Sequence, residues 1–266
     1  MCENVPPCQH RPAPTKDNYS VIEINNEYDP FAPSYNRNWG ADYRIEAVPL
    51  VERVLLTRLK PGAAVLDLCC GTGQFTQQIA EKGFDVAGLD ASGEMIRFAK
   101  INAPEVRFTV ADAREFSLDR KFQAVYSVFE SLNHIPDLAG LEQVFACVRQ
   151  HLEPKGAFLF DLNREEAFQL YWNITDAIVD PDHVIATRSV YDEETQTATC
   201  ELTVFEPSGK LWTRRDFTVR QTFHEIELVQ EALRRAGFKN VSLMDAFDAG
   251  MKGSAGHART FFLATL

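Results

Sequence analysis

Hydrophobic positions in the central part of the chain follow two alternating spacings. Short, continuous apolar runs are separated by segments in which apolar residues recur every three to four positions. The runs predict buried β-strands and the spaced segments predict amphipathic helices, because these periods place apolar side chains on one face of each element. The predicted strands span 64–68, 85–89, 106–110, 122–128 and 156–162, and the predicted helices span 74–82, 92–101 and 138–152.

This alternation predicts an α/β fold with a parallel sheet. The strands are apolar throughout instead of at every second position, which is typical of strands covered by helices on both faces. Another amphipathic helix is predicted from Asp42 to Leu59, and Pro61-Gly62 ends it. We expect ligands to bind at the carboxyl ends of such strands.

The pattern changes after residue 162. Three runs rich in Thr and Val, separated by polar turns, predict an antiparallel meander over 183–192, 197–206 and 211–221. A helix at 226–236, closed by Gly237, and strands at 241–245 and 259–265 then return to the first pattern. We interpret the meander as a cap inserted after the fifth strand of a seven-stranded sheet.

Four regions follow from this reading. We predict a disordered, Pro-rich lead-in over 1–18, and a core over 19–162 that begins with a helical lid. An inserted antiparallel β cap is predicted over 163–222, and the chain is expected to return to the core over 223–266.

The composition narrows the class of partner. The 266 residues are 45% hydrophobic and 24% charged, which fits one globular core or a core with an inserted subdomain. A net charge of -11 disfavours nucleic acid as a partner and favours a small molecule. No apolar run approaches the roughly 20 residues that span a bilayer. We therefore expect a cytoplasmic protein with no membrane partner. Separately, we expect a monomer or a homodimer.

The six cysteines indicate neither a disulfide framework nor a metal site. They form no CxxC pair, and Cys69 and Cys70 are adjacent in what we expect to be a buried strand. We predict reduced core thiols and no bound metal. A weak alternative is a metal cluster of Cys2, Cys8 and His10 in the lead-in.

Candidate chemistry is concentrated between residues 65 and 76, where a strand runs into a glycine turn that opens a helix. Gly71 and Gly73 would let the backbone approach a ligand, and the helix start offers free N–H groups. Asp67, at the end of the first strand, could attract a cationic amino group. Asp90 ends the second strand, where an acid accepts hydrogen bonds from ribose hydroxyls.

A dinucleotide site is the main rival interpretation of this segment. The third glycine of a G-x-G-x-x-G motif would fall at Thr76, and a pyrophosphate would be repelled by Asp67. A ligand with an ammonium and a sulfonium group would be attracted instead. These residues therefore point to S-adenosylmethionine (SAM).

In these residues the chain resembles the class I SAM-dependent methyltransferases, and the resemblance covers about residues 28–266. Residues 67–73 resemble the glycine motif of these enzymes. Asp90 resembles their ribose-binding acid, and Asp112 resembles their adenine-contacting acid. The resemblance implies a Rossmann-like seven-stranded sheet, SAM as cofactor, S-adenosylhomocysteine (SAH) as product and no metal. It implies these cofactor-binding residues: Tyr35, Tyr43, Asp67, Cys69, Gly71, Gly73, Asp90, Ala91, Met95, Asp112, Ala113 and Ser127.

A narrower resemblance concerns the acceptor. Residues 127–135, residues 161–163 and the meander are similar to small-molecule methyltransferases with an antiparallel cap, among them amino-sugar N-methyltransferases. Residues 28–32 and Tyr35 resemble the segment that closes over SAM in that group. The chain departs from the wider family at Cys70, where Ala or Gly is common. It also lacks Asn/Asp-Pro-Pro-Tyr after the fourth strand, which disfavours amide or nucleobase methylation.

The expected reaction is in-line transfer of a methyl group from SAM to a nitrogen or oxygen of a small molecule. His134 follows the fourth strand, and a pKa near the usual value of about 6.5 would suit it as a base for a hydroxyl acceptor. Glu130 is the alternative catalytic group, as a base or as a partner for a cationic substrate.

Several alternatives stay open at this point. Asp90 could be a helix N-cap, His134 a solvated loop residue, and the N-terminal tyrosines plain core aromatics. For the whole chain, the alternatives are a non-catalytic SAM- or SAH-binding sensor or assembly subunit, and an RNA or protein methyltransferase.

Overall fold

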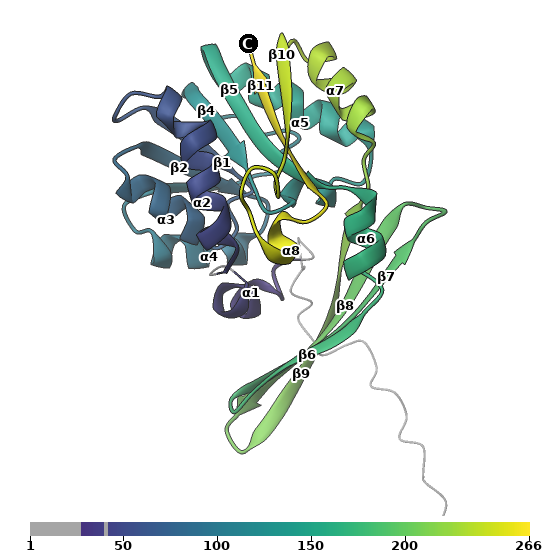
Figure 1. Cartoon of the computed structure of the whole chain (residues 1–266). Coiled ribbons are helices and arrows are strands. Elements are labelled where there is room, and N and C mark those ends of the chain that lie inside the picture. Colours follow the sequence, from purple (N-terminus) through teal and green to yellow (C-terminus); the bar gives the residue numbers. More distant parts are fainter. Residues whose placement is uncertain (1–27, 40–41) are drawn as a thin grey trace, which may run out of the picture.

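The structure, a computed structural model, describes residues 28–39 and 42–266 (Figure 1). The predicted lead-in over 1–18, the alternative metal cluster within it and the first nine residues of the predicted core lie outside these ranges.

A seven-stranded sheet forms the centre of the fold, in the order β10-β11-β5-β4-β1-β2-β3. Its strands are β1 (Ala64–Leu68), β2 (Asp85–Asp90), β3 (Arg107–Val110), β4 (Phe122–Ser127), β5 (Leu152–Asn163), β10 (Asn240–Asp245) and β11 (Arg259–Thr265). The first five pair in parallel, as predicted. The last strand, β11, runs antiparallel to both β5 and β10. It follows β10 without a long crossover helix, and a parallel pairing needs such a crossover.

Helices cover both faces of this sheet (Figure 1). Apolar side chains of α5 and α7 pack on one face, and those of α2 and α3 pack on the other. The predicted helix to Leu59 divides into α2 and a short 3₁₀ helix, η1. The helical elements are α1 (Ala32–Asn38), α2 (Asp42–Val54), η1 (Leu56–Arg58), α3 (Gln74–Glu81), α4 (Gly93–Asn102), η2 (Ser131–His134), α5 (Leu138–His151), α6 (Glu165–Tyr171), α7 (Ile226–Arg235) and α8 (Gly253–Gly256).

A second, antiparallel sheet follows β5 and stands apart from the first in Figure 1. Its strands, in spatial order, are β6 (Thr175–Asp180), β7 (His183–Asp192), β8 (Thr197–Ser208) and β9 (Leu211–Thr222). The sequence predicts the last three, whereas β6 and α6 are additional elements. Phe31 of the segment before α1 packs against apolar side chains of this sheet. We call this four-stranded sheet the cap.

Candidate active site

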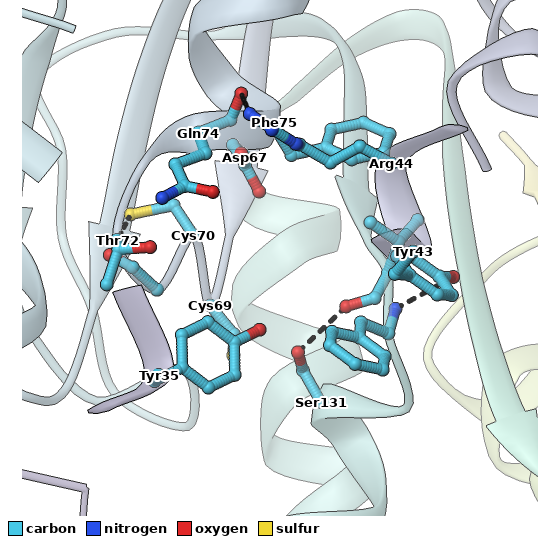
Figure 2. A pocket seen from close by; sticks show the side chains of 13 residues that line it. Tyr35, Tyr43, Arg44, Asp67, Cys69, Cys70, Thr72, Gln74, Phe75 and Ser131 are labelled. Atoms are coloured by element: carbon cyan, nitrogen blue, oxygen red, sulfur yellow. Dashed lines mark hydrogen bonds between the residues drawn. The ribbon is translucent and has the colours of Figure 1, made fainter. Parts of the chain in front are cut away.

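Two cavities lie at the carboxyl ends of β1 and β4. The larger has a volume of about 720 Å³ and is lined by the core sheet edge, the N-terminal segment, the loop after β4 and the cap. The smaller has a volume of about 50 Å³ and is shown in Figure 2. Both are lined by Tyr35, Cys69, Gly71, Phe129 and Ser131. The cavities are therefore adjacent parts of one site, at the sheet edge where the sequence predicts a ligand.

The turn after β1 forms the wall between them. Cys69 and Cys70 lie in this turn and not within the strand as predicted, because Cys69 adopts a left-handed φ of 61°. Gly71 and Gly73 also have positive φ values, of 53° and 72°. A Cβ atom on Gly73 would lie 2.8 Å from Ala99 of α4, so this glycine allows two helices to approach. Gly73 lines neither cavity, whereas Gly71 lines both.

Asp90, at the end of β2, holds this turn and lines the larger cavity. One carboxylate oxygen accepts the Gly71 N–H at 2.8 Å, and the other accepts the Ser92 N–H at 2.9 Å. Burial raises the pKa of Asp90 to about 6, against the effect of these donors. The N-cap of α4 is Ser92, whose hydroxyl accepts the Met95 N–H. The N-cap alternative for Asp90 therefore does not apply.

Four other predicted cofactor residues line the larger cavity beside Asp90. They are Ala91, Met95, Asp112 and Ala113. Met95 and Ala113 are buried and apolar. Asp112 pairs with Arg114 at 2.6 Å, and this hydrogen bond lowers the pKa of the carboxyl. This end of the cavity thus combines an apolar wall with two carboxylates.

The smaller cavity is lined by one carboxylate and one guanidinium. Asp67 is buried and accepts a hydrogen bond from the Thr76 hydroxyl at 2.6 Å. Burial raises the pKa of Asp67 to about 7. Thr76 thus orients this acid, at the position where a dinucleotide motif would have its third glycine.

Arg44 of α2 supplies the guanidinium, and sequence reasoning missed it. It donates to the Gln74 carbonyl at 3.4 Å, as Figure 2 shows. Its buried Nε has no hydrogen-bond partner within the described residues, and the same holds for Oε1 of Gln74. No local sequence pattern marks Arg44, because only the packing of α2 beside α3 brings it to the cavity.

The aromatic residues of the N-terminal helices form part of the walls. Tyr35 lines both cavities and Tyr43 lines the smaller one. The Tyr43 hydroxyl accepts the Phe129 N–H at 3.0 Å, and the two rings stack with centroids 4.2 Å apart. Tyr43 is therefore a core aromatic and a cavity residue at once.

The loop after β4 brings the predicted catalytic residues to the larger cavity. Phe129 and Glu130 both have left-handed φ values, and η2 follows them. Glu130 forms an ion pair with the buried Arg259, and its N–H donates to Asp161 at 3.1 Å. Burial raises the pKa of Glu130 to about 7, although Arg259 acts in the opposite direction. Ser127, at the end of β4, is fully buried and lines neither cavity.

His134 lies in the same cavity as a neutral imidazole. Its Nδ1 is 2.5 Å from the Arg220 carbonyl, which can only accept, so Nδ1 carries the proton. Its Nε2 therefore accepts, and the Tyr28 hydroxyl lies 2.7 Å away. The predicted pKa near 6.5 is wrong, because burial lowers the pKa of His134 to about 4.

Comparison with known proteins identifies the family. A model of a methyltransferase domain matches residues 65–156. YqeM of Bacillus subtilis, a protein named as a methyltransferase, is 31% identical over 205 residues, which are 75% of this chain and 83% of YqeM. The chain belongs to the SAM-dependent methyltransferase family.

Two further relatives of the methyltransferase extend this result. A dTDP-3-amino-3,4,6-trideoxy-alpha-D-glucopyranose N,N-dimethyltransferase of Streptomyces venezuelae is 28% identical over 203 residues, covering 75% of this chain and 85% of the relative. The crystal structure of a SAM-dependent methyltransferase from Clostridium acetobutylicum superposes with a TM-score of 0.74 at 24% identity. The superposition covers 91% of this chain and 99% of the Clostridium acetobutylicum protein. This last similarity confirms the fold.

The cap supplies much of the other end of the methyltransferase's larger cavity. All four of its strands contribute residues to the wall, with two aromatic residues at the end of α6: Tyr171, Trp172, Asp176, Thr187, Ser189, Cys200, Leu202, Val219, Arg220 and Gln221. This wall is partly apolar and carries a few polar groups, as is common in small-molecule sites.

Within residues 28–39 and 42–266 of the methyltransferase, no three His, Cys, Asp or Glu side chains are grouped so that they could hold a metal ion. No helix in the same ranges is long and apolar enough to cross a membrane.

Proposed function

We propose that this methyltransferase transfers a methyl group from SAM to the amine nitrogen of a small, sugar-like molecule. The observation that carries the proposal is the pair of adjoining cavities, one with Asp67 and Arg44 and the other running from Asp90 to the cap. The choice of an amine is supported by the amino-sugar substrate in the name of the Streptomyces venezuelae relative.

The residues of both cavities fit SAM. The methionine end of SAM carries an ammonium and a carboxylate, and the smaller cavity offers Asp67 and the partly unpartnered Arg44 as their counterparts. At the other end, Asp90 would accept hydrogen bonds from the ribose, and Met95 and Ala113 would contact adenine. When bound, SAM supplies a methyl group already activated on a sulfonium, a chemistry that needs no metal ion.

The chain's own residues would then position the acceptor. Holding an acceptor atom in line at about 3 to 3.5 Å can remove roughly 7 to 11 kcal/mol of barrier. The neutral Nε2 of His134 has one lone pair, which faces the Tyr28 hydroxyl, and it would orient an N–H or O–H group of an acceptor that takes the place of this hydroxyl in the larger cavity. With its low pKa, His134 is a weak base, which suits an amine acceptor better than a hydroxyl acceptor.

A screen for SAH release tests this function. Purified protein and SAM would be incubated with pairs of small molecules that differ only in an amine or a hydroxyl, including amino sugars free and nucleotide-linked. We expect SAH release with at least one amine and a much slower reaction with its hydroxyl partner. Equal rates, or activity with hydroxyl partners alone, would contradict amine transfer.

The same assay separates the alternative functions. A metabolite extract that still accepts methyl groups after nuclease and protease treatment would exclude RNA and protein acceptors. SAH binding without turnover on any small-molecule pool would support the non-catalytic sensor or assembly subunit. The four predicted regions, the cytoplasmic location and the monomeric or homodimeric state stay predictions.

A further inference from the structure

A buried cluster of three charged groups lies behind the wall of the larger cavity. Arg259, at the start of β11, pairs with both Glu130 and Asp161. Asp161 and Arg259 are 0% and 4% exposed, and of the three only Glu130 lines the cavity. With both acids ionised, two negative charges face one positive charge, so one negative charge is left without a counter-ion. Such an arrangement is costly to bury and would be relieved by one proton or one cation.

The cluster also fixes the shape of the loop after β4. Asp161 on β5 accepts the Glu130 N–H through the same oxygen that pairs with Arg259. The Arg259 guanidinium lies 5.1 Å from the ring centroid of Tyr43, which in turn stacks on Phe129. Left-handed φ values at Phe129 and Glu130 are unfavourable for residues with side chains. These contacts therefore hold the Glu130 carboxylate in a defined place at the cavity wall.

We propose that Asp161 and Arg259 are positioning residues that keep one uncompensated negative charge at Glu130, and that Glu130 takes the proton of an ammonium acceptor. The inference rests on the proposed function, because it concerns amine acceptors. An ammonium nitrogen has no free lone pair. Moving its proton to a Glu130 carboxylate oxygen breaks one N–H bond, forms one O–H bond, and leaves a neutral amine beside a neutral acid. The pKa of Glu130, raised to about 7, suits this exchange near neutral pH.

Apart from Asp161 and Arg259, the tyrosines and the histidine that lie near Glu130 are neutral at pH 7. Burial raises the hydroxyl pKa values of Tyr28, Tyr35 and Tyr43, so all three stay neutral at pH 7. His134 is also neutral, since burial lowers its pKa to about 4. The charged residues elsewhere on the cavity wall are Asp90, Asp112, Arg114, Asp176 and Arg220.

The first experiment needs no acceptor. Side-chain carboxyl signals of ¹³C-labelled glutamate would be followed by NMR against pH, and Glu130 would be identified by the signal lost in Glu130→Gln. Asp161→Asn removes a neighbouring negative charge, so we expect the Glu130 midpoint to fall by about one pH unit or more. Arg259→Gln should move the midpoint upward, and Arg259→Lys should bring it back toward wild type.

Arg164→Gln is the matched control for the NMR titration. This arginine, near the start of β11 in space, pairs with Asp245 and Glu166 instead of Glu130, so the midpoint should not move. A purely structural role would weaken folding in both Asp161→Asn and Arg259→Gln without moving the midpoint in opposite directions. Midpoints that stay constant, or move the same way, would overturn the proposal. If Arg259→Gln does not fold, Asp161→Asn and Arg259→Lys still decide between these outcomes.

The second experiment uses the amine acceptor found by the SAH-release screen and its hydroxyl partner as probes. Calorimetry on the SAH-loaded protein should show that Glu130→Gln weakens amine binding about tenfold or more and changes hydroxyl binding much less. Equal losses for both probes would overturn the role in amine recognition. If the screen finds no amine, the proposed function fails, and the NMR titration still judges the cluster separately.

Discussion

At the scale of single residues, the site depends on buried carboxylates, and burial disfavours their ionised form. Asp67 shows this most clearly, since burial raises its pKa from 3.8 to about 7. An ammonium group binds the ionised form much more strongly than the neutral acid. Below pH 7, binding of the amino group of SAM or SAH is therefore coupled to the release of a proton from Asp67.

A pH dependence of ligand binding follows from Asp67. We expect the affinity for SAH to rise between pH 5.5 and 7.5, by up to about tenfold per pH unit below the pKa of Asp67, and then to level off. Calorimetry across this range would measure it. Asp67→Asn should bind SAH more weakly and show a flatter profile. A wild-type profile as flat as that of the variant would contradict the assignment of the amino-group site.

The free energy of unfolding of the unliganded protein should depend on pH in the opposite direction to SAH affinity, so it should fall as pH rises. A carboxyl with a raised folded-state pKa stabilises the fold fully below its unfolded pKa of about 4, and this contribution is lost as pH rises through about 7. Urea unfolding should therefore show wild type losing stability relative to Asp67→Asn between pH 5 and pH 8. A difference between the two proteins that is independent of pH would show that Asp67 is already ionised at pH 5.

Asp90 gives a second prediction at this scale. Asp90→Asn keeps the shape of the side chain but removes the charge that would face the ribose. A hydrogen bond to a charged group contributes about 1.5 to 3 kcal/mol, so SAH affinity should fall roughly tenfold or more. The control is Asp85→Asn, an acid at the exposed start of the same strand that pairs with Arg120. Equal SAH affinities for both variants and wild type would remove Asp90 from the ligand site.

At the scale of elements, the cap is expected to select the acceptor and to leave cofactor binding unchanged. Side chains alternate along β7: Thr187 lines the larger cavity, whereas Val190 is 53% exposed. Thr187→Val removes one hydroxyl from the wall and should raise the KM for the acceptor about two- to tenfold, with an unaltered Kd for SAH. Val190→Thr, the reverse exchange, should change neither constant. A changed Kd for SAH in Thr187→Val would place this strand beside the cofactor instead.

Whether a strand could be predicted from the sequence depended on how deeply it is buried. Strand β1 occurs over the predicted residues and β4 ends one residue earlier than predicted, because continuous apolar runs mark buried strands directly. Strand β6 escaped prediction because it lies at the edge of the cap and most of its side chains are exposed, which leaves no apolar alternation. Asp67 and Asp90 were predictable as cavity residues because each occurs at a strand end. The place of Arg44 and the pairing of Arg259 with Glu130 and Asp161 were not, because tertiary packing alone brings these side chains together.

At the scale of the whole molecule, ligand binding should stabilise the fold. The two cavities join the N-terminal helices, the edge of the central sheet and the cap, so a ligand that fills them contacts all three parts. At a concentration 100 times its Kd, a ligand that binds only the folded state adds about 2.7 kcal/mol of stability. For a chain of this size, each kcal/mol raises Tm by roughly 2–4 °C. We therefore expect SAM and SAH to raise Tm by about 5–10 °C with one ligand bound per chain.

NAD serves as the discriminating ligand in the same melting experiment. Its pyrophosphate would lie near Asp67, whose carboxylate repels an anion, and Thr76 occupies the position of the third dinucleotide-motif glycine. We expect NAD at the same concentration to leave Tm unchanged. Adenosine separates the two halves of the site, because it can use Asp90 and Met95 but offers nothing to Asp67 and Arg44. Its shift should therefore be smaller than that of SAH, and Asp67→Asn should reduce the SAH shift while leaving the adenosine shift intact. A shift with NAD that exceeds the shift with SAH would contradict the assignment of both cavities to SAM.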